Sequence, residues 1–191
     1  MTLMLIAGPA EEPVTLAEAR AHLRLEAGGE DALLTALLTA ARVMLEAETR
    51  RAFVTQDWRL ILDDWPATWI ALPLAPVAAV TSVKVAAMSG AMLALDPGFY
   101  EVDAKGEPPR VAAKRGQAWP MPATRLGGIE VAFTAGYGGA ASVPAPLKQA
   151  VLLLAAHWFE NREPVGAYGS GGAELPLTVS ALAARYRRVH L

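Results

Sequence analysis

The chain has 191 residues, a length that suits one domain or one domain with a modest insertion. Hydrophobic residues make up 53% of it and charged residues 19%, which excludes a chain that is disordered throughout. The formal net charge of -2 lacks the basic excess of a protein that grips duplex DNA, and the absence of cysteine excludes disulfides, thiolate nucleophiles and cysteine-ligated metal centres.

The first 52 residues predict two helices. Thr15 and Glu18 have the spacing of a capping box, and a Gly-Gly pair ends the segment that follows them. From about residue 31 to residue 51, apolar residues recur at intervals of three and four, the pattern of an amphipathic helix. Because the connection between the two is short, residues 1–52 are predicted to form a helical hairpin.

An antiparallel β-rich insertion is predicted over residues 53–139. Near Phe53 the periodicity changes from helical to alternating, and side chains alternate with a period of two as far as Leu62. Pro, Gly and Asp turn signals separate the short β-rich pieces that follow. These pieces are residues 69–74, 77–85, 99–103, 110–113 and 129–134.

A late apolar helix is predicted over residues 140–163, begun by Pro144 and Pro146. Its apolar run, residues 150–156, is well below the roughly 18 to 20 residues that span a bilayer, so a membrane anchor is not expected. Apolar side chains lie on every side of this helix, and neighbouring copies of the chain are therefore expected to cover part of it. The residues expected in the helical body or at this contact between subunits are Leu147, Val151, Leu154, Trp158 and Phe159.

A Gly-rich linker, residues 164–176, leads to a C-terminal helix or tail, residues 177–191. Positive charge is concentrated at the end of this tail. Two interpretations are open for it: a solvated helix end, where cations complement the helix dipole, and a docking segment whose Arg and Tyr side chains bind a partner.

No combination of residues predicts a catalytic, metal or cofactor site. His157 and Glu160 have the spacing of two metal ligands on a helix, but the other histidines are far away in the sequence and no HExxH motif is present. Asp63 and Asp64 are neighbours at a strand, where consecutive side chains point to opposite faces. An enzyme that uses one of these four residues is a hypothesis that the sequence leaves open.

Two Gly-rich stretches, residues 136–139 and 169–172, lack the Lys and the Ser or Thr of a phosphate-binding loop and are predicted to be linkers. A further hypothesis is a carbohydrate- or protein-binding β-module on a helical stalk. It rests on the tryptophans in or near the β region, although aromatic residues there are more often part of a core. They are Trp58, Trp65, Trp69 and Trp119.

Four stretches carry a resemblance to a known family: VTLAEARAHLRLE at 14–26, EDALLTALLTAARVMLEAETRRAFVTQDW at 30–58, IEVAFTAGYGG at 129–139 and VPAPLKQAVLLLAAHWFENRE at 143–163. In order and spacing they resemble the head-tail connector, or adaptor, family of tailed phages, prophages and gene transfer agents, in particular its members with a β-rich insert. Together they span most of the chain.

The resemblance implies an α+β fold, with a helical body and an antiparallel β-rich insertion, and a structural protein that is not an enzyme and needs no cofactor. Such proteins are assembled in the host cytoplasm and form a ring, usually twelvefold, beneath the portal protein in the neck of the particle. The ring extends the DNA channel and offers a platform to a stopper or tail protein. A mildly acidic chain suits a channel through which DNA passes without specific binding.

In similar proteins a C-terminal segment docks on the portal, and by position this implies the part of the chain from Leu175 to Leu191. The residues expected to dock are Leu175, Leu177, Leu182, Arg185, Tyr186, Arg187, Arg188 and Leu191.

Overall fold

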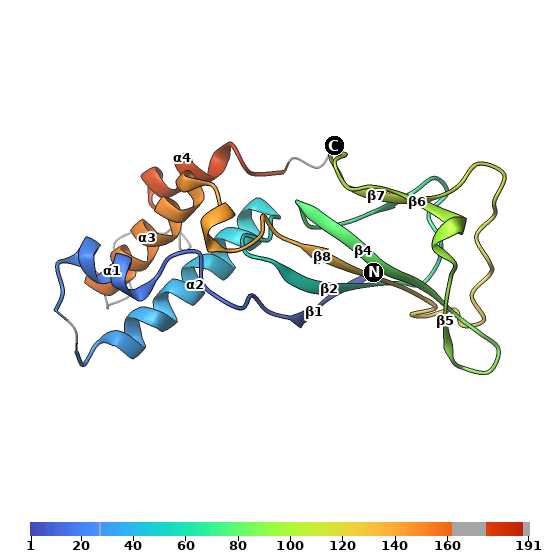
Figure 1. Cartoon of the computed structure of the whole chain (residues 1–191), viewed down its shortest axis with the longest axis horizontal. Helices are drawn as coiled ribbons and strands as arrows, with labels where there is room; N and C mark the ends of the chain where they lie inside the picture. The colour runs from blue at the N-terminus through green and yellow to red at the C-terminus, as the bar shows by residue number, and fades with distance from the viewer. Residues whose placement is uncertain (27, 162–174, 189–191) are drawn as a thin grey trace, which may run out of the picture. The chain divides into compact units, whose positions relative to one another are not determined.

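The structure, a computed structural model, describes residues 1–26, 28–161 and 175–188. It combines helices with antiparallel sheets, which confirms the predicted α+β class (Figure 1). The chain forms two compact units, and each is built from separate stretches of sequence. The first unit comprises Met1–Pro9 and Thr55–Tyr137, and the second comprises Ala10–Val54 and Gly138–Leu191.

A five-stranded antiparallel sheet dominates the first unit. Its strands lie in the order β1 (Thr2–Ala7), β2 (Gln56–Leu62), β8 (Ile129–Ala135), β4 (Val77–Ala86) and β5 (Met92–Ala94). β8 is the central strand, and its residues alternate between buried and half-buried, as expected where one face of a strand packs on a core. Val131 and Phe133 are among its buried residues.

The first strand, β1, has no counterpart in the sequence-based prediction, which assigned residues 1–52 to helices. β1 pairs antiparallel with β2, from Thr2 opposite Ile61 to Ala7 opposite Asp57. Its sequence, TLMLIA, does not alternate between apolar and polar residues, so it shows no period of two. Because its partner lies far away along the chain, local sequence does not determine that this segment is a strand.

A smaller, three-stranded sheet also belongs to the first unit, with β3 (Ile70–Ala71), β7 (Arg110–Ala113) and β6 (Tyr100–Asp103) in that order. Ile70 and Val111 are opposite each other across β3 and β7, and both are buried. A short 3-10 helix, η1 (Pro97–Phe99), precedes β6, and the Asp96 side chain accepts a hydrogen bond from the Gly98 N–H at its start.

The second unit is helical and contains α1 (Leu16–Leu23), α2 (Asp31–Thr49), the 3-10 turn η2 (Ala140–Ser142), α3 (Ala145–Glu160) and α4 (Leu177–Ala184). The predicted capping box at the start of α1 is confirmed. The Thr15 hydroxyl accepts from the Glu18 N–H, and the Thr15 N–H donates to Glu18 Oε2 at 2.7 Å. Two of the otherwise unpaired N–H groups at this helix start are therefore satisfied.

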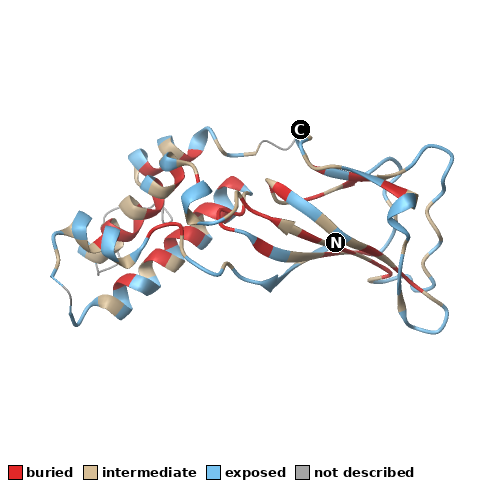
Figure 2. Ribbon diagram, viewed as in Figure 1, coloured by how far each residue is buried: buried red, intermediate tan, exposed pale blue. Residues whose placement is uncertain are grey.

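The core of the helical unit lies between α2 and α3, and it continues to α1 and α4 (Figure 2). α2 contributes Leu34, Leu38 and Leu45, each 2% exposed or less. Each such side chain stabilises the unit by about 1.5–3 kcal/mol relative to an exposed position. None of the helices in the described residues has the length and apolarity that a membrane span requires.

The chain passes between the two units three times, at residues 9–10, 54–55 and 137–138. Each passage lies next to one end of a strand: the first comes after the last residue of β1, Ala7, the second before the first residue of β2, Gln56, and the third after the last residue of β8, Ala135. These three strands are neighbours in the sheet. In the sheet Ala7 is opposite Asp57 and Gln56 is opposite Ala135. All three passages therefore leave the sheet from the same end of three neighbouring strands.

Candidate functional site

Asp63 and Asp64, two of the residues of the catalytic hypothesis, stabilise turns of the chain. Asp63 Oδ1 accepts a hydrogen bond from the Gly127 N–H at 2.8 Å, and Asp64 Oδ1 accepts from the Trp65 N–H at 2.8 Å. A carboxylate that caps a backbone N–H in this way satisfies a local donor, which is the role of a turn residue and not of a catalytic pair.

His157 lies on the last turn of α3, and Asn161 closes that helix. The Asn161 side-chain nitrogen lies 3.3 Å from His157 Nδ1 and donates to the His157 carbonyl at 2.8 Å. Among the described residues, no three His, Asp or Glu side chains are grouped so that they could hold a metal ion. The geometry of this helix end is that of a capped terminus.

The first Gly-rich stretch, residues 136–139, is a tight connection from β8 to the helical segment. Gly136 and Gly138 have φ values of 137° and 124°, which side chains rarely adopt. A Cβ at Gly138 would also lie 3.0 Å from Ser142 Oγ. The glycines are therefore required by the turn itself. The second stretch, residues 169–172, lies outside the described residues.

Three of the four tryptophans in or near the β region contact other side chains of their own chain. Trp65 and Trp119 are stacked, with ring centroids 4.3 Å apart and an interplanar angle of 3°. The Arg110 guanidinium lies 5.1 Å from the centre of the Trp69 ring. Stacking and cation–π contacts occupy ring faces that a sugar would need. The arrangement does not favour a carbohydrate platform.

An open groove of about 400 Å³ runs beside Trp69. Two of the charged residues that line it are paired with each other, because Arg110 Nη2 lies 3.1 Å from Asp103 Oδ2. Both side chains are close to half-exposed, so water also satisfies them. The third charged residue that lines the groove, Glu101, is exposed, so the groove offers one carboxylate beside an ion pair and not the several convergent polar groups of a built ligand site.

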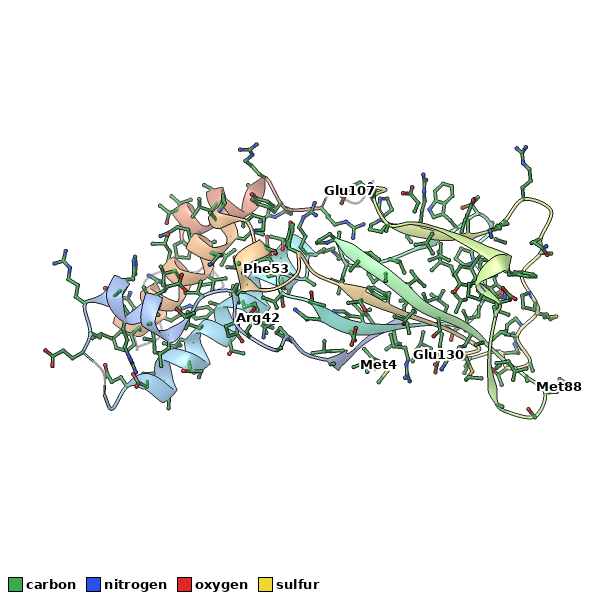
Figure 3. All side chains as sticks on the ribbon, viewed as in Figure 1. Met4, Arg42, Phe53, Met88, Glu107 and Glu130 are labelled. Carbon is green, nitrogen blue, oxygen red and sulfur yellow. The ribbon has the colours of Figure 1, made fainter. Side chains whose placement is uncertain are left out.

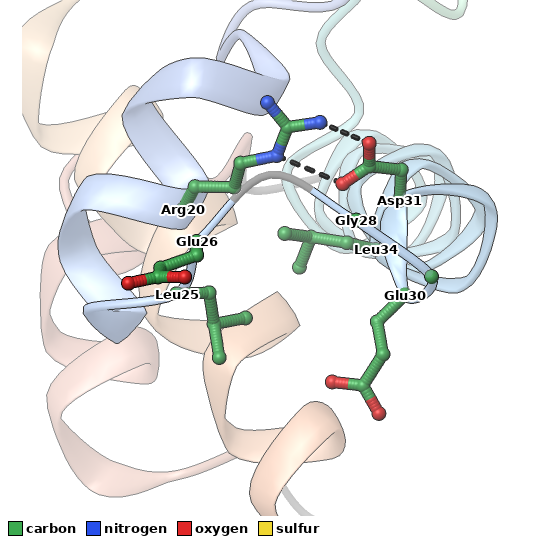
Figure 4. Close-up of a pocket in the computed structure, with 8 residues that line it drawn as sticks. Arg20, Leu25, Glu26, Gly28, Glu30, Asp31 and Leu34 are labelled. Carbon is green, nitrogen blue, oxygen red and sulfur yellow. Dashed lines mark hydrogen bonds and ion pairs between the residues drawn. The ribbon is translucent and has the colours of Figure 1, made fainter.

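The helical unit has a small pocket of about 80 Å³ between the end of α1 and the start of α2 (Figure 4). Arg20 on α1 and Asp31 on α2 face each other across it in a bidentate ion pair, in which Arg20 Nε donates to Asp31 Oδ1 at 2.8 Å. The volume suffices for a few water molecules. The pair joins the two helices, and Arg20, the one cation among the lining residues, is taken up by it.

The five residues of α3 that were expected at a contact between subunits fall into two groups. Leu147, Val151 and Leu154 are 0%, 0% and 1% exposed, and they are covered by their own chain. Neighbouring copies are therefore not needed to cover these three side chains, contrary to the expectation from the sequence, since α1, α2 and α4 pack around α3. Trp158 and Phe159 are half-buried and retain surface.

The C-terminal helix, α4, packs on α3 and is fastened to the end of α2. Val179 and Ala183 are 1% and 0% exposed. Arg51 Nε donates to the Tyr186 carbonyl at 2.6 Å, and the Arg188 N–H donates to the Thr49 carbonyl at 3.2 Å. These bonds satisfy carbonyls and cations at the end of α2 and hold the tail on its own chain.

The residues expected to dock on a portal differ in how accessible they are. Leu177 is 89% exposed and Arg185 is also exposed. Arg187 forms an ion pair with Glu48 of α2. The half-buried members of the set are Leu175, Leu182, Tyr186 and Arg188, and Leu191 lies outside the described residues. The tail therefore has an inner face on the helical unit and an outer face that includes Leu177 and Arg185.

A further apolar surface, on β1, was not expected from the sequence. Met4, Leu5 and Ile6 are 44%, 49% and 52% exposed, and Figure 3 labels Met4 beside the strand. The only sign in the sequence is that residues 2–7 carry no charge. Such a segment is normally assigned to a core, so its exposure could not be read from the pattern.

No model of a known protein family matches the sequence, and no curated protein matches it. Solved structures do match. A chain in the neck of an empty gene transfer agent (GTA) particle, computed with C6 symmetry, is 32% identical with a TM-score of 0.84, over 100% of this chain and 97% of that chain. A chain in the virion of a native GTA particle is 34% identical with a TM-score of 0.80 over the same shares.

A third match, in the neck of a native GTA particle computed with C12 symmetry, is 32% identical with a TM-score of 0.80, again over 100% of this chain and 97% of that chain. Identity at this level over the whole length shows common descent as well as a common fold. The chain belongs to the family of head-tail connector proteins found in GTA necks. The resemblance stated from the sequence is thus confirmed, and this connector is a structural component of the particle neck.

Proposed function

We propose that this connector is the adaptor subunit of a phage-like particle. Its copies form a ring beneath the portal protein, extend the DNA channel and join the head to a stopper or tail protein, without enzymatic activity. The observation that carries the proposal is the whole-chain similarity, at 32% identity, to chains in GTA necks computed with C6 and C12 symmetry.

A ring is the assembly that such symmetry favours. In a closed ring each interface joins two different patches of the subunit, so the chain needs two complementary surfaces and no two-fold contact. Twelve copies would agree with the C12 neck. Leu147, Val151 and Leu154 of α3 are buried within one chain, so the subunit is expected to fold without its neighbours.

The tail supplies the portal contact in this proposal. Leu177, at 89% exposure, and the exposed Arg185 present an apolar and a cationic group on the outer face of α4. Arg and large apolar residues contribute strongly to interfaces when a partner covers them. Tyr186 and Arg187, which bind Arg51 and Glu48, position the helix for that contact.

The net charge of -2 is consistent with a channel lining that does not retain DNA. A basic lumen would bind the phosphate backbone and make passage dependent on salt. We therefore expect no specific contact between this connector and the DNA that passes it.

Electron microscopy of the purified chain with and without portal protein tests the function. Ring-shaped particles, or assembly of the chain on the portal, are expected. A chain that remains a compact monomer in both samples, at concentrations where the portal itself forms rings, would overturn the proposal.

A further inference from the structure

β1 is an edge strand whose exposed surface is apolar on both sides. It hydrogen-bonds to β2 along one edge, and no strand among the described residues pairs with its other edge. Successive residues of a strand point to opposite faces, so Met4 and Leu5 expose 44% and 49% of their side chains on different faces of the sheet. A single layer placed on one face would cover only half of this surface.

Most of the strand, Thr2–Leu5, carries none of the usual protection against pairing. Soluble proteins keep edge strands apart from other chains with charges, prolines, bulges or short length. Thr2–Ala7 has no charge and no proline, and its one bulge follows Leu5, so Thr2–Leu5 remain in regular register with β2. At the other edge of the same sheet, β5 has only 3 residues and is protected by its length.

We propose that the free edge of β1 is part of the contact between subunits, and that an extended segment of a second copy of this chain pairs along it. An added strand would satisfy the free backbone groups of the edge. It would also bring side chains to both faces at once, which fits the exposure of Met4, Leu5 and Ile6.

The partner is a second copy because the related necks have sixfold and twelvefold symmetry, so like chains adjoin one another there. The segment that pairs with β1 is not β1 of the next copy. β1 has one free edge because β2 occupies the other, so pairing two copies of β1 would use that edge on both chains and stop at a dimer. This inference rests on the proposed ring, and the experiment separates the two.

The first arm tests assembly with Leu5→Glu, which places a carboxylate on the β1 surface. Its matched control is Leu126→Glu, because Leu126 is 81% exposed on a loop of the same unit. Both variants should unfold like the wild type, since neither side chain is buried. Leu5→Glu should weaken association by at least about tenfold in analytical ultracentrifugation and electron microscopy with portal present, and Leu126→Glu should assemble normally.

The second arm identifies the occupant. The chain contains no cysteine, so Thr2→Cys gives a single attachment point for a maleimide-linked benzophenone. Irradiation of the assembled ring should join two copies of this chain, and mass spectrometry should place the second site outside β1. Adducts only with portal or tail protein, or a disulfide between two Cys at position 2, would overturn the inference.

The outcomes distinguish the inference from the proposed function. If the wild type never assembles, the ring itself is wrong. If the wild type and Leu5→Glu assemble equally, the ring stands and the role of β1 is refuted. Loss of assembly in both variants would also refute a specific role for β1.

Discussion

Arg42 of α2 donates from Nε to Glu12 Oε2 at 2.7 Å, across 30 positions of sequence. Its Nη1 donates to Glu46 at 2.7 Å, and Glu46 in turn accepts from the Phe53 N–H at 2.7 Å. Burial alone would lower the pKa of Arg42, but its hydrogen bond to Glu12 and the two carboxylate charges outweigh burial and raise it. Arg42 therefore connects α2 directly to Glu12, before α1, and through Glu46 to Phe53, after α2.

Replacing this cation should destabilise the helical unit strongly. In Arg42→Met, Glu12 and Glu46 lose their ion pairs with Arg42, and Glu46 is only 8% exposed. Breaking a buried pair from one side typically lowers the free energy of unfolding by about 3–5 kcal/mol. Urea denaturation measures the change. Arg110→Met, which removes an exposed pair with Asp103, should cost about 1 kcal/mol or less; equal losses would contradict the structure.

The capping box gives a second stability prediction. Thr15→Ala removes the acceptor for the Glu18 N–H, and the free energy of unfolding should fall by about 1 kcal/mol. Thr15→Ser keeps the hydroxyl and should restore most of the loss. A full loss in Thr15→Ser would show that the methyl group, and not the hydrogen bond, matters.

Glu18 should also make stability depend on pH. Its pKa is lowered, first by the hydrogen bond from the Thr15 N–H and then by the Thr15 hydroxyl. A carboxyl with a lowered folded-state pKa stabilises the fold above its unfolded pKa, and the stabilisation disappears as the pH falls through the folded pKa. The difference in unfolding free energy between wild type and Glu18→Gln should therefore be present at neutral pH and vanish in acid. A difference that stays constant with pH would contradict this.

Two positions on α4 separate the packing of the tail from its proposed docking. Val179→Asp places a carboxylate at a site that is 1% exposed, so α4 should detach and its amides should exchange rapidly with deuterium. Leu177→Asp changes a side chain that is 89% exposed and should leave stability within about 0.5 kcal/mol of the wild type. If the proposed function holds, Leu177→Asp should nevertheless bind portal more weakly in a pull-down. Undiminished binding by this folded variant would refute the docking role of Leu177.

The stacked tryptophans should be energetically coupled. Trp65 and Trp119 are parallel at 4.3 Å, and Trp65 Nε1 donates to the Pro120 carbonyl at 2.7 Å. A double-mutant cycle with leucine at each position should give a coupling energy of roughly 1 kcal/mol. Additive losses would mean that the two rings contribute only through their separate contacts.

Local patterns predicted those elements whose signals are local. The strand predicted at 110–113 coincides with β7, the piece at 77–85 falls within β4 (Val77–Ala86), and the amphipathic period from about residue 31 gave α2. The capping residues marked the start of α1 because both partners of the box lie within one turn. Such signals depend on neighbouring residues and survive without tertiary information.

Elements that depend on distant partners could not be found in the same way. β1 is a strand because β2 pairs with it, and β5, with 3 residues, is too short to show a period. For α3, the sequence showed that apolar side chains lie on every side of the helix, but the prediction that other subunits cover part of them was not needed for the buried ones. A single chain supplies helices on several sides of α3, so Val151 is fully buried without a second copy. Helix periodicity gives the amount of apolar surface and not the identity of what covers it.

The three passages between the units have a mechanical consequence. A force that pulled the helical unit away from the strands would be divided among β1, β2 and β8, which lie side by side and are loaded from the same end. Because the three strands would move together, the load would reach the rest of the sheet through the hydrogen bonds between β8 and β4, which lie across the strands and would have to shear together. Under tension the two units would thus be held together by three strands in parallel and not by a single one.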